Sequence, residues 1–145
     1  MDQLGLEYLL GKQVSVISSL IVTENDDEFE IDDSLILELE NGELAQLFIL
    51  DNKLLLLLLG SINDTRITGD FDLANCSKRL KRISKVGKSQ IECITSYSVD
   101  SSGYTFGIKF FNAKETCLFS ICLGFDEIEY LEKVTDFEEM LDNYK

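Results

Sequence analysis

The pattern of apolar and polar positions along this chain predicts two runs of strands. In the first run, residues 14–22 are apolar and β-branched, and leucines alternate with other positions over 34–40. Asn41-Gly42 follows and is a strong signal for a tight hairpin turn, so residues 43–50 are expected to return antiparallel. Residues 54–59 are six leucines with no polar face, which predicts a central strand covered on both sides.

A second run of strands is expected after residue 90. Residues 90–99 favour a strand, and apolar residues alternate from Tyr104 to Phe110 (Tyr104, Phe106, Ile108 and Phe110), which predicts one buried face. Residues 116–123 are expected to return, and 128–131 to add an edge strand. The chain has no proline, so the turns expected at 51–52, 101–103 and 112–114 rely on Asn, Asp, Ser and Gly.

Three short helices are expected beside the strands. Residues 3–10 are one, ended by Gly11. Apolar residues at 73, 76, 80 and 83 follow helical spacing, so 72–86 is expected to be amphipathic, with Asp72 as its N-cap. Thr135-x-x-Glu138 is a capping box that predicts a closing helix. The expected fold class is α+β and β-rich: two similar antiparallel β-meander halves, each preceded by a short helix, with a short C-terminal helix.

The two halves resemble each other. Gly11-Lys12 and Gly87-Lys88 each precede a strand, and one inserted residue brings the two stretches into register. Asn41 and Asn112 then fall at matching turns. We therefore expect one domain, 1–145, built by duplication of 1–60 and 73–131. The alternative is two unrelated strand sets with similar turns.

The charge balance narrows the functions open to the chain. It has 145 residues, with 13 Lys and Arg against 27 Asp and Glu, a net charge of −14, and no His. The length is that of one domain. So negative a charge argues against binding nucleic acid or an anionic membrane and favours a basic partner. Without histidine, Ser–His or Cys–His catalysis and His-ligated metals are excluded.

Other chemistry has little support in the sequence. Cys76, Cys93, Cys117 and Cys122 match no zinc spacing and are expected to be reduced thiols. There is no P-loop, G-x-S-x-G or dinucleotide fingerprint, and among 27 acids a carboxylate pair carries no specificity. No apolar run is long enough to span a membrane, and the acidic N-terminus is unlike a secretory signal. We expect a non-enzymatic cytoplasmic protein, without cofactor or metal, monomeric rather than homodimeric.

Two acidic clusters are the candidate partner-binding surfaces. The first places seven carboxylates in ten residues, within an expected loop between the first two strands that the other half lacks. Its Phe29 is either a binding anchor or, like Ile31, the inward-packing start of the next strand. This surface comprises Glu24, Asp26, Asp27, Glu28, Phe29, Glu30, Asp32 and Asp33. The second comprises Phe125, Asp126, Glu127, Glu129 and Tyr130.

One basic stretch interrupts this acidic chain. Six of the 13 positive residues lie between 78 and 88: Lys78, Arg79, Lys81, Arg82, Lys85 and Lys88. Protein surfaces that bind single-stranded nucleic acid combine basic with aromatic side chains, and no aromatic residue lies among these six. We expect a basic helix face that balances the protein's own acidic loops.

The chain resembles the immunity proteins of bacterial contact-dependent inhibition and polymorphic toxin systems. The residues that carry the resemblance are the Gly11-Lys12-x-Val14 opening after a helix, the hairpin around Leu37-Glu38-Leu39-Glu40-Asn41-Gly42, and the acidic insert at 24–33. The resemblance implies an antidote that covers the active site or substrate cleft of a cognate toxin, often a basic nuclease. These families differ in fold, so no site residue carries over. The alternatives are a type III secretion chaperone and, more remotely, a small-molecule enzyme that uses carboxylates.

Overall fold

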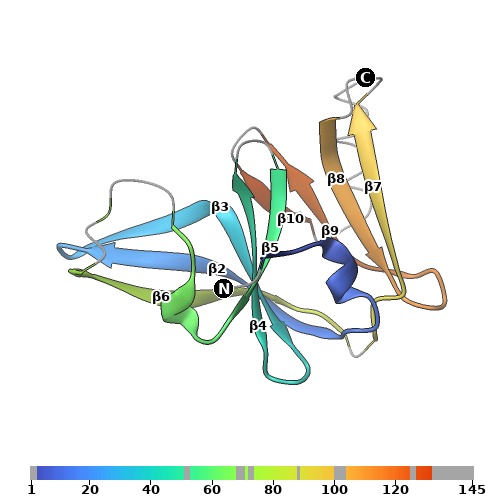
Figure 1. The fold of residues 1–145 in the computed structure, drawn as a ribbon, viewed down its shortest axis with the longest axis horizontal. Helices are drawn as coiled ribbons and strands as arrows, with labels where there is room; N and C mark the ends of the chain where they lie inside the picture. Colours follow the sequence, from blue (N-terminus) through green and yellow to red (C-terminus); the bar gives the residue numbers. More distant parts are fainter. Residues whose placement is uncertain are drawn as a thin grey trace.

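Two antiparallel β-sheets pack face to face in the computed structural model of the chain (Figure 1). The structure describes residues 3–50, 53–67, 71, 74–87, 89–99, 104–124 and 127–131. Within these ranges the strands are β1 (Gln3–Leu4), β2 (Val14–Glu24), β3 (Asp27–Leu39), β4 (Leu44–Leu50), β5 (Lys53–Leu59), β6 (Cys76–Lys85), β7 (Cys93–Val99), β8 (Tyr104–Phe111), β9 (Cys117–Leu123) and β10 (Ile128–Leu131). Two 3-10 turns, η1 (Leu6–Leu9) and η2 (Ile62–Asp64), complete the described elements.

The larger sheet has six strands in the order β1-β5-β4-β3-β2-β6, and the smaller has four in the order β10-β9-β8-β7. Each sheet therefore contains a four-stranded meander in chain order, β2 to β5 and β7 to β10. That arrangement is compatible with a duplication, which stays a prediction. Asn41 and Asn112 close matching turns, because each side-chain oxygen accepts the backbone N–H two residues later.

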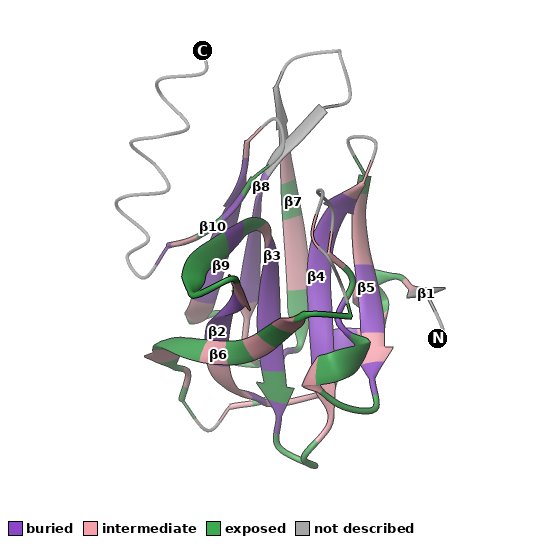
Figure 2. Cartoon of the chain, turned by 90° about the vertical axis from the view of Figure 1, so that its left-hand side faces the viewer, coloured by how far each residue is buried: buried purple, intermediate pink, exposed green. Residues whose placement is uncertain are grey.

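The main core lies between the two sheets. It includes Ile17, Leu37 and Leu47 from the larger sheet and Phe110 and Phe119 from the smaller one, whose rings stack with centroids 4.3 Å apart. A second core covers the other face of the larger sheet. There Leu20, Ile36, Phe48 and Leu57 pack against Ile62, Ile67 and Phe71 of the segment between β5 and β6, which we call the crossover segment (residues 60–75). The larger sheet is thus buried on both faces over most of its area, and β6 and the tip of the β2–β3 hairpin (Asn25–Glu30) are the more exposed parts (Figure 2).

The leucine strand β5 is covered on both faces, as its sequence predicts. Leu56 belongs to the main core and Leu57 to the second one. Its expected central position is wrong, since only the two-residue strand β1 lies beyond it.

The expected α+β fold class is wrong, because the described residues contain no α-helix. Residues 3–10 form β1 and η1 instead, since so short a helix is marginal and Gln3 and Leu4 pair with β5. The left-handed Gly11 (φ 80°) does follow directly. The closing helix expected at 135–144 lies outside the described residues, as do the turns at 51–52 and 101–103.

The expected amphipathic helix at 72–86 is also wrong, because its described part is the edge strand β6. Cys76 and Leu80 are an even number apart, so they share one face of a strand as readily as of a helix, and both pack against the second core. Ile83 follows the helical spacing but not the two-residue period of a strand, and it lies at the shift in β2–β6 register between residues 82 and 84. Pairing along β2 therefore overrides the helical pattern.

No helix in the described residues is long and apolar enough to cross a membrane.

Candidate functional site

The acidic segment 24–33 is the end of a long hairpin, so its expected position in a loop is wrong. Strand β2 continues to Glu24, and β3 already begins at Asp27. The two residues between them, Asn25 and Asp26, have φ of 51° and 67°. Positive φ at both central positions defines a type I′ turn, which matches the twist of the strands it joins. We call residues 20–33 the acidic hairpin.

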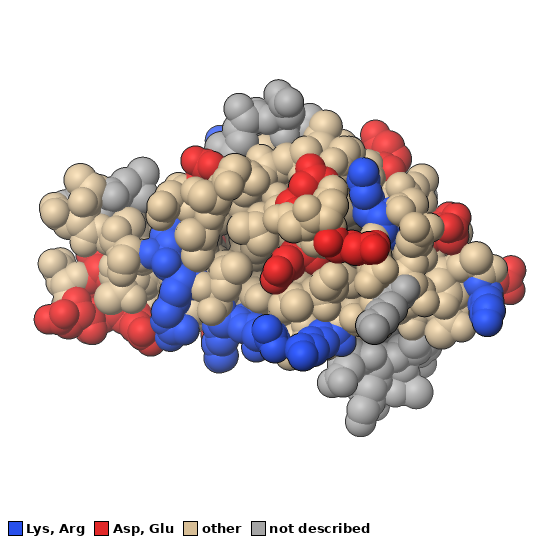
Figure 3. Space-filling view, turned by 90° about the horizontal axis from the view of Figure 1, so that it is seen from below, with Lys and Arg blue, Asp and Glu red and all other residues tan. Residues whose placement is uncertain are grey.

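The acidic hairpin extends beyond β4 and β5, with β6 beside it (Figure 1). Strand β4 pairs with β3 only at Ser34–Glu38, so β3 residues 27–31 pair with β2 alone. Strand β6 flanks β2 on the other side, from Cys76 opposite Glu24 onward. Figure 3 shows the acidic side chains gathered at this end of the molecule, beside the row of basic ones. Paired strands hold these carboxylates in a fixed array.

Register places opposite charges on one face of the hairpin. Ile21 lies opposite Glu30 on β3 and Arg79 on β6, and directly opposed side chains share a face. Arg79 also donates to Glu28, at 3.1 Å, with both side chains more than half exposed. An ion pair so exposed adds little to stability.

Phe29 and Ile31 lie on the opposite face from Glu28 and Glu30. Ile31 is buried in the second core, as expected for the inward-packing start of a strand. Phe29 is 42% exposed and meets Phe71 edge-on, with ring centroids 5.4 Å apart. Much of the Phe29 ring is therefore open to a partner while its position is fixed by a neighbour.

Asp32 and Asp33 lie on a bulge in β3. Leu20 pairs with Ile31 and Ser18 with Ile36, so five steps along β3 face two along β2, and 5 − 2 leaves three extra residues. Bulges of this kind bend a strand and redirect its side chains. Here the bulge brings Asp32 to the wall of a groove.

That groove, of about 500 Å³, joins part of the first candidate surface to part of the second. It is lined by Ser19, Glu30, Ile31, Asp32, Ser34, Leu35, Ile83, Ile128, Glu129 and Tyr130. Tyr130 is half-buried, and its hydroxyl donates to Ser84 Oγ at 3.1 Å. Glu127 is exposed just before β10, whereas Phe125 and Asp126 lie outside the described residues.

Sequence reasoning missed Ser19 and Ile83, which line this groove. The sequence does hold a signal for Ser19. Ser18-Ser19 interrupts an apolar strand, and a buried polar side chain requires a hydrogen-bond partner or access to a ligand or water. Ile83 is 42% exposed, and its place follows only from the β2–β6 register shift.

The basic residues of β6 have different roles. The Lys78 ammonium donates to the backbone oxygens of Asn63 and Thr65, at 3.0 and 2.9 Å, and so ties the crossover segment to the edge strand. Arg79 contacts the acidic hairpin, as a counter-charge would. Lys81, Arg82 and Lys85 are exposed, and Lys88 lies outside the described residues.

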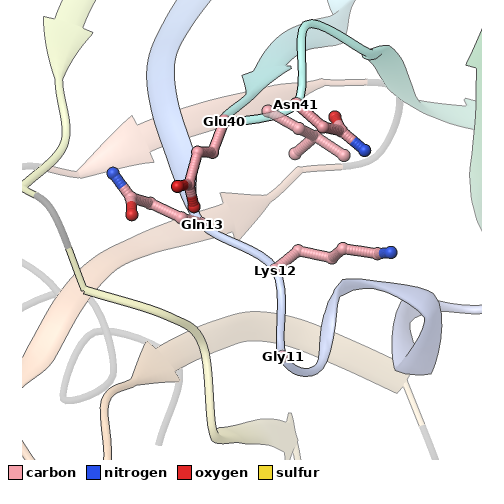
Figure 4. Close-up of a pocket in the computed structure, with 6 residues that line it drawn as sticks. Gly11, Lys12, Gln13, Glu40 and Asn41 are labelled. Atoms are coloured by element: carbon pink, nitrogen blue, oxygen red, sulfur yellow. The ribbon is translucent and has the colours of Figure 1, made fainter.

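Other parts of the described chain offer less to a ligand. A hollow of about 250 Å³ lies between Gly11–Gln13 and Leu39–Asn41. Figure 4 shows the Lys12 side chain extending away from the Glu40 carboxylate, so its charged groups do not converge. The described residues contain no cluster of His, Cys, Asp and Glu suited to a metal. All four cysteines are free thiols, and burial raises the pKa of Cys122.

Comparison of the chain with protein-family models, with curated proteins and with solved structures finds no match. The chain's own residues therefore carry the functional argument.

Proposed function

We propose that this chain is a binding protein whose acidic hairpin and adjoining groove take a basic protein partner. One observation carries the proposal: seven carboxylates in ten residues lie along an ordered hairpin, its turn and the adjoining bulge, with a partly exposed Phe29 among them. A solvated acidic loop would need neither the ordered strands nor the aromatic ring.

The two kinds of side chain suit different stages of binding. Fixed carboxylates create a focused negative potential that speeds the approach of a basic protein. Affinity depends more on desolvated apolar anchors, and aromatic side chains are prominent among them. Phe29 is such an anchor, because Phe71 supports one side of its ring and solvent reaches another.

The finer form of the proposal is an immunity protein that neutralises a bacterial toxin. A nuclease toxin presents a positive cleft to its substrate's phosphates, and a rigid acidic projection competes for that cleft by charge. The type III chaperone alternative loses its main support, which was an expected alternation of helices and strands. Residues 3–10 and 76–85 were expected to be helices, but they form β1 with η1 and the strand β6. No observation favours an enzyme.

Growth rescue tests the proposal. Each reading frame beside the gene is expressed under tight control in a bacterial host, with and without this chain. We expect one frame to stop growth and co-expression to restore it. The Phe29→Ala chain should rescue less well than the parent, whereas Glu38→Gln, an exposed acid at the far end of β3, should rescue fully. If no neighbouring product is toxic, or if a toxic one is not neutralised, the immunity role is wrong.

Binding kinetics then test the acidic hairpin itself. Losing an aromatic anchor is expected to weaken binding by about thirtyfold, through a faster dissociation rate. The double variant Asp26→Asn with Asp27→Asn should instead slow association, and high salt should shrink its deficit. If both variants bind like the parent, the partner contacts another surface.

A further inference from the structure

We propose that the groove between the β3 bulge and β10 receives an arginine side chain of the basic partner. The inference rests on the proposed function and assigns a chemical role to one part of that surface. The groove, of about 500 Å³, has the size of a small-ligand site and combines an apolar wall with a few polar groups.

Ser19 supplies an unused polar group on the groove wall. Ser19 is only 6% exposed, yet its hydroxyl has no hydrogen-bond partner among the described residues. No fully enclosed side-chain oxygen or nitrogen in the described part of the chain lacks a partner. The small exposed area of Ser19 therefore includes its hydroxyl, and the groove is what that side chain lines. A hydroxyl in this position can accept an N–H donor from a ligand.

The apolar wall of the groove suits the stem of a long cationic side chain. Ile31, Leu35 and Ile128 are buried in the two cores, and each also lines the groove. Ile83 remains 42% exposed beside them. Arginine and lysine place their methylene groups along such surfaces and keep the charged head at the rim.

The charged residues of the groove come from both sheets. Glu30 and Asp32 belong to β3 and Glu129 to β10, and all three are exposed. Tyr130 adds an aromatic ring, whose position is fixed by the hydrogen bond to Ser84. Lys81 lies opposite Ser19 on β6 and offsets part of this negative charge.

These groups favour arginine over lysine. A guanidinium presents five N–H donors in one plane, so it can reach carboxylates on two different strands and stack on a tyrosine ring at once. An ammonium is a compact charge that needs close solvation and gains less from separated acceptors.

Nuclear magnetic resonance titration tests this with a defined probe, N-acetyl-arginine methylamide. The matched control probe is N-acetyl-citrulline methylamide, which has nearly the same shape and no charge. We expect the arginine probe to saturate with a dissociation constant on the order of millimolar. Its amide shift changes should centre on Ser19, Asp32, Ile83 and Tyr130, and the citrulline probe should give none of comparable size.

Three variants sharpen the titration. Asp32→Asn and Glu129→Gln should each raise the dissociation constant of the arginine probe by about fivefold. Ser19→Ala should also weaken binding of the probe, without altering the urea midpoint of the protein. Glu38→Gln removes one exposed charge from the same strand outside the groove and should change affinity less than twofold. Equal binding of both probes, shifts spread over all acidic residues, or an equal effect of Glu38→Gln overturns the inference. Because this readout needs no partner, it can fail while growth rescue succeeds, or the reverse.

Discussion

The buried side chain of Gln46 attaches the crossover segment to the larger sheet, and its replacement by leucine measures what that attachment contributes. Gln46 is 0% exposed and sits in β4 between Ile36 and Leu57, both in the second core. Its amide nitrogen donates to Ser34 Oγ at 2.8 Å and to the Arg66 carbonyl oxygen at 2.7 Å. Its amide oxygen accepts the Arg66 backbone N–H at 2.7 Å.

Gln46→Leu keeps the side-chain volume and removes all three bonds. Each contributes about 1 kcal/mol net, which gives about 3 kcal/mol for the set. Ser34 is 2% exposed, so its hydroxyl loses a donor that water does not readily replace, whereas the added leucine gains apolar burial. That burial returns about 1 kcal/mol, so we expect the free energy of unfolding to fall by about 2 kcal/mol.

Urea unfolding of the variant and the parent measures this loss. Gln90→Leu is the control, because Gln90 is an exposed glutamine outside the strands, and it should change stability by less than about 0.5 kcal/mol. Trypsin adds a local readout, since release of the crossover segment should speed cleavage after Arg66. The reasoning is refuted if the Gln46→Leu chain unfolds within about 0.5 kcal/mol of the parent, which is the limit of such a measurement, and its cleavage at Arg66 is unchanged.

Three further predictions follow from single residues. Gly42→Ala should cost about 1 kcal/mol in urea unfolding, because φ is 87° there although no atom would meet the added methyl group. A thiol reagent should modify the exposed Cys93 well before the buried Cys122, and equal rates would contradict that burial. Because burial raises the folded pKa of the Cys122 thiol above its ordinary value of 9.0, the folded state holds its proton more tightly. Stability should therefore fall as the pH rises above 9.0, and Cys122→Ala should flatten that decline in urea midpoints measured from pH 8 to 10.

Local patterns were sufficient for most of the strands. The turn at Asn41-Gly42 depends on Gly42, which adopts a positive φ, and alternation marks β8 and the second half of β3 directly. The strand β6 could not be predicted this way, because its apolar residues fit a helix and only the neighbouring strand β2 selects the extended form. The carboxylates at 24–33 suggested a loop for a similar reason. Clustered charge disfavours a strand in isolation, and only the pairing with β2 shows that this segment is extended.

The candidate surfaces, too, were predictable from the sequence only in part. Composition located the two acidic clusters, but their meeting in one groove depends on a three-residue bulge and on how the sheets pack. Neither leaves a signature in a single sequence. Ser19 lines the groove from a stretch of β2 that is otherwise buried, and only the packing of β10 and the β3 bulge around it places it there.

The two-residue strand β1 has a consequence for handling the protein. Gln3 and Leu4 pair with Leu57 and Leu56, so they occupy the outer edge of the all-leucine strand at its middle. A segment of six apolar residues without charge or proline is the kind that stacks into cross-β fibrils once its edge is free. Proteolytic trimming of the first four residues would therefore convert a protected sheet edge into a template for fibril growth, even though Leu4 is the one described residue of the main core's margin that it removes.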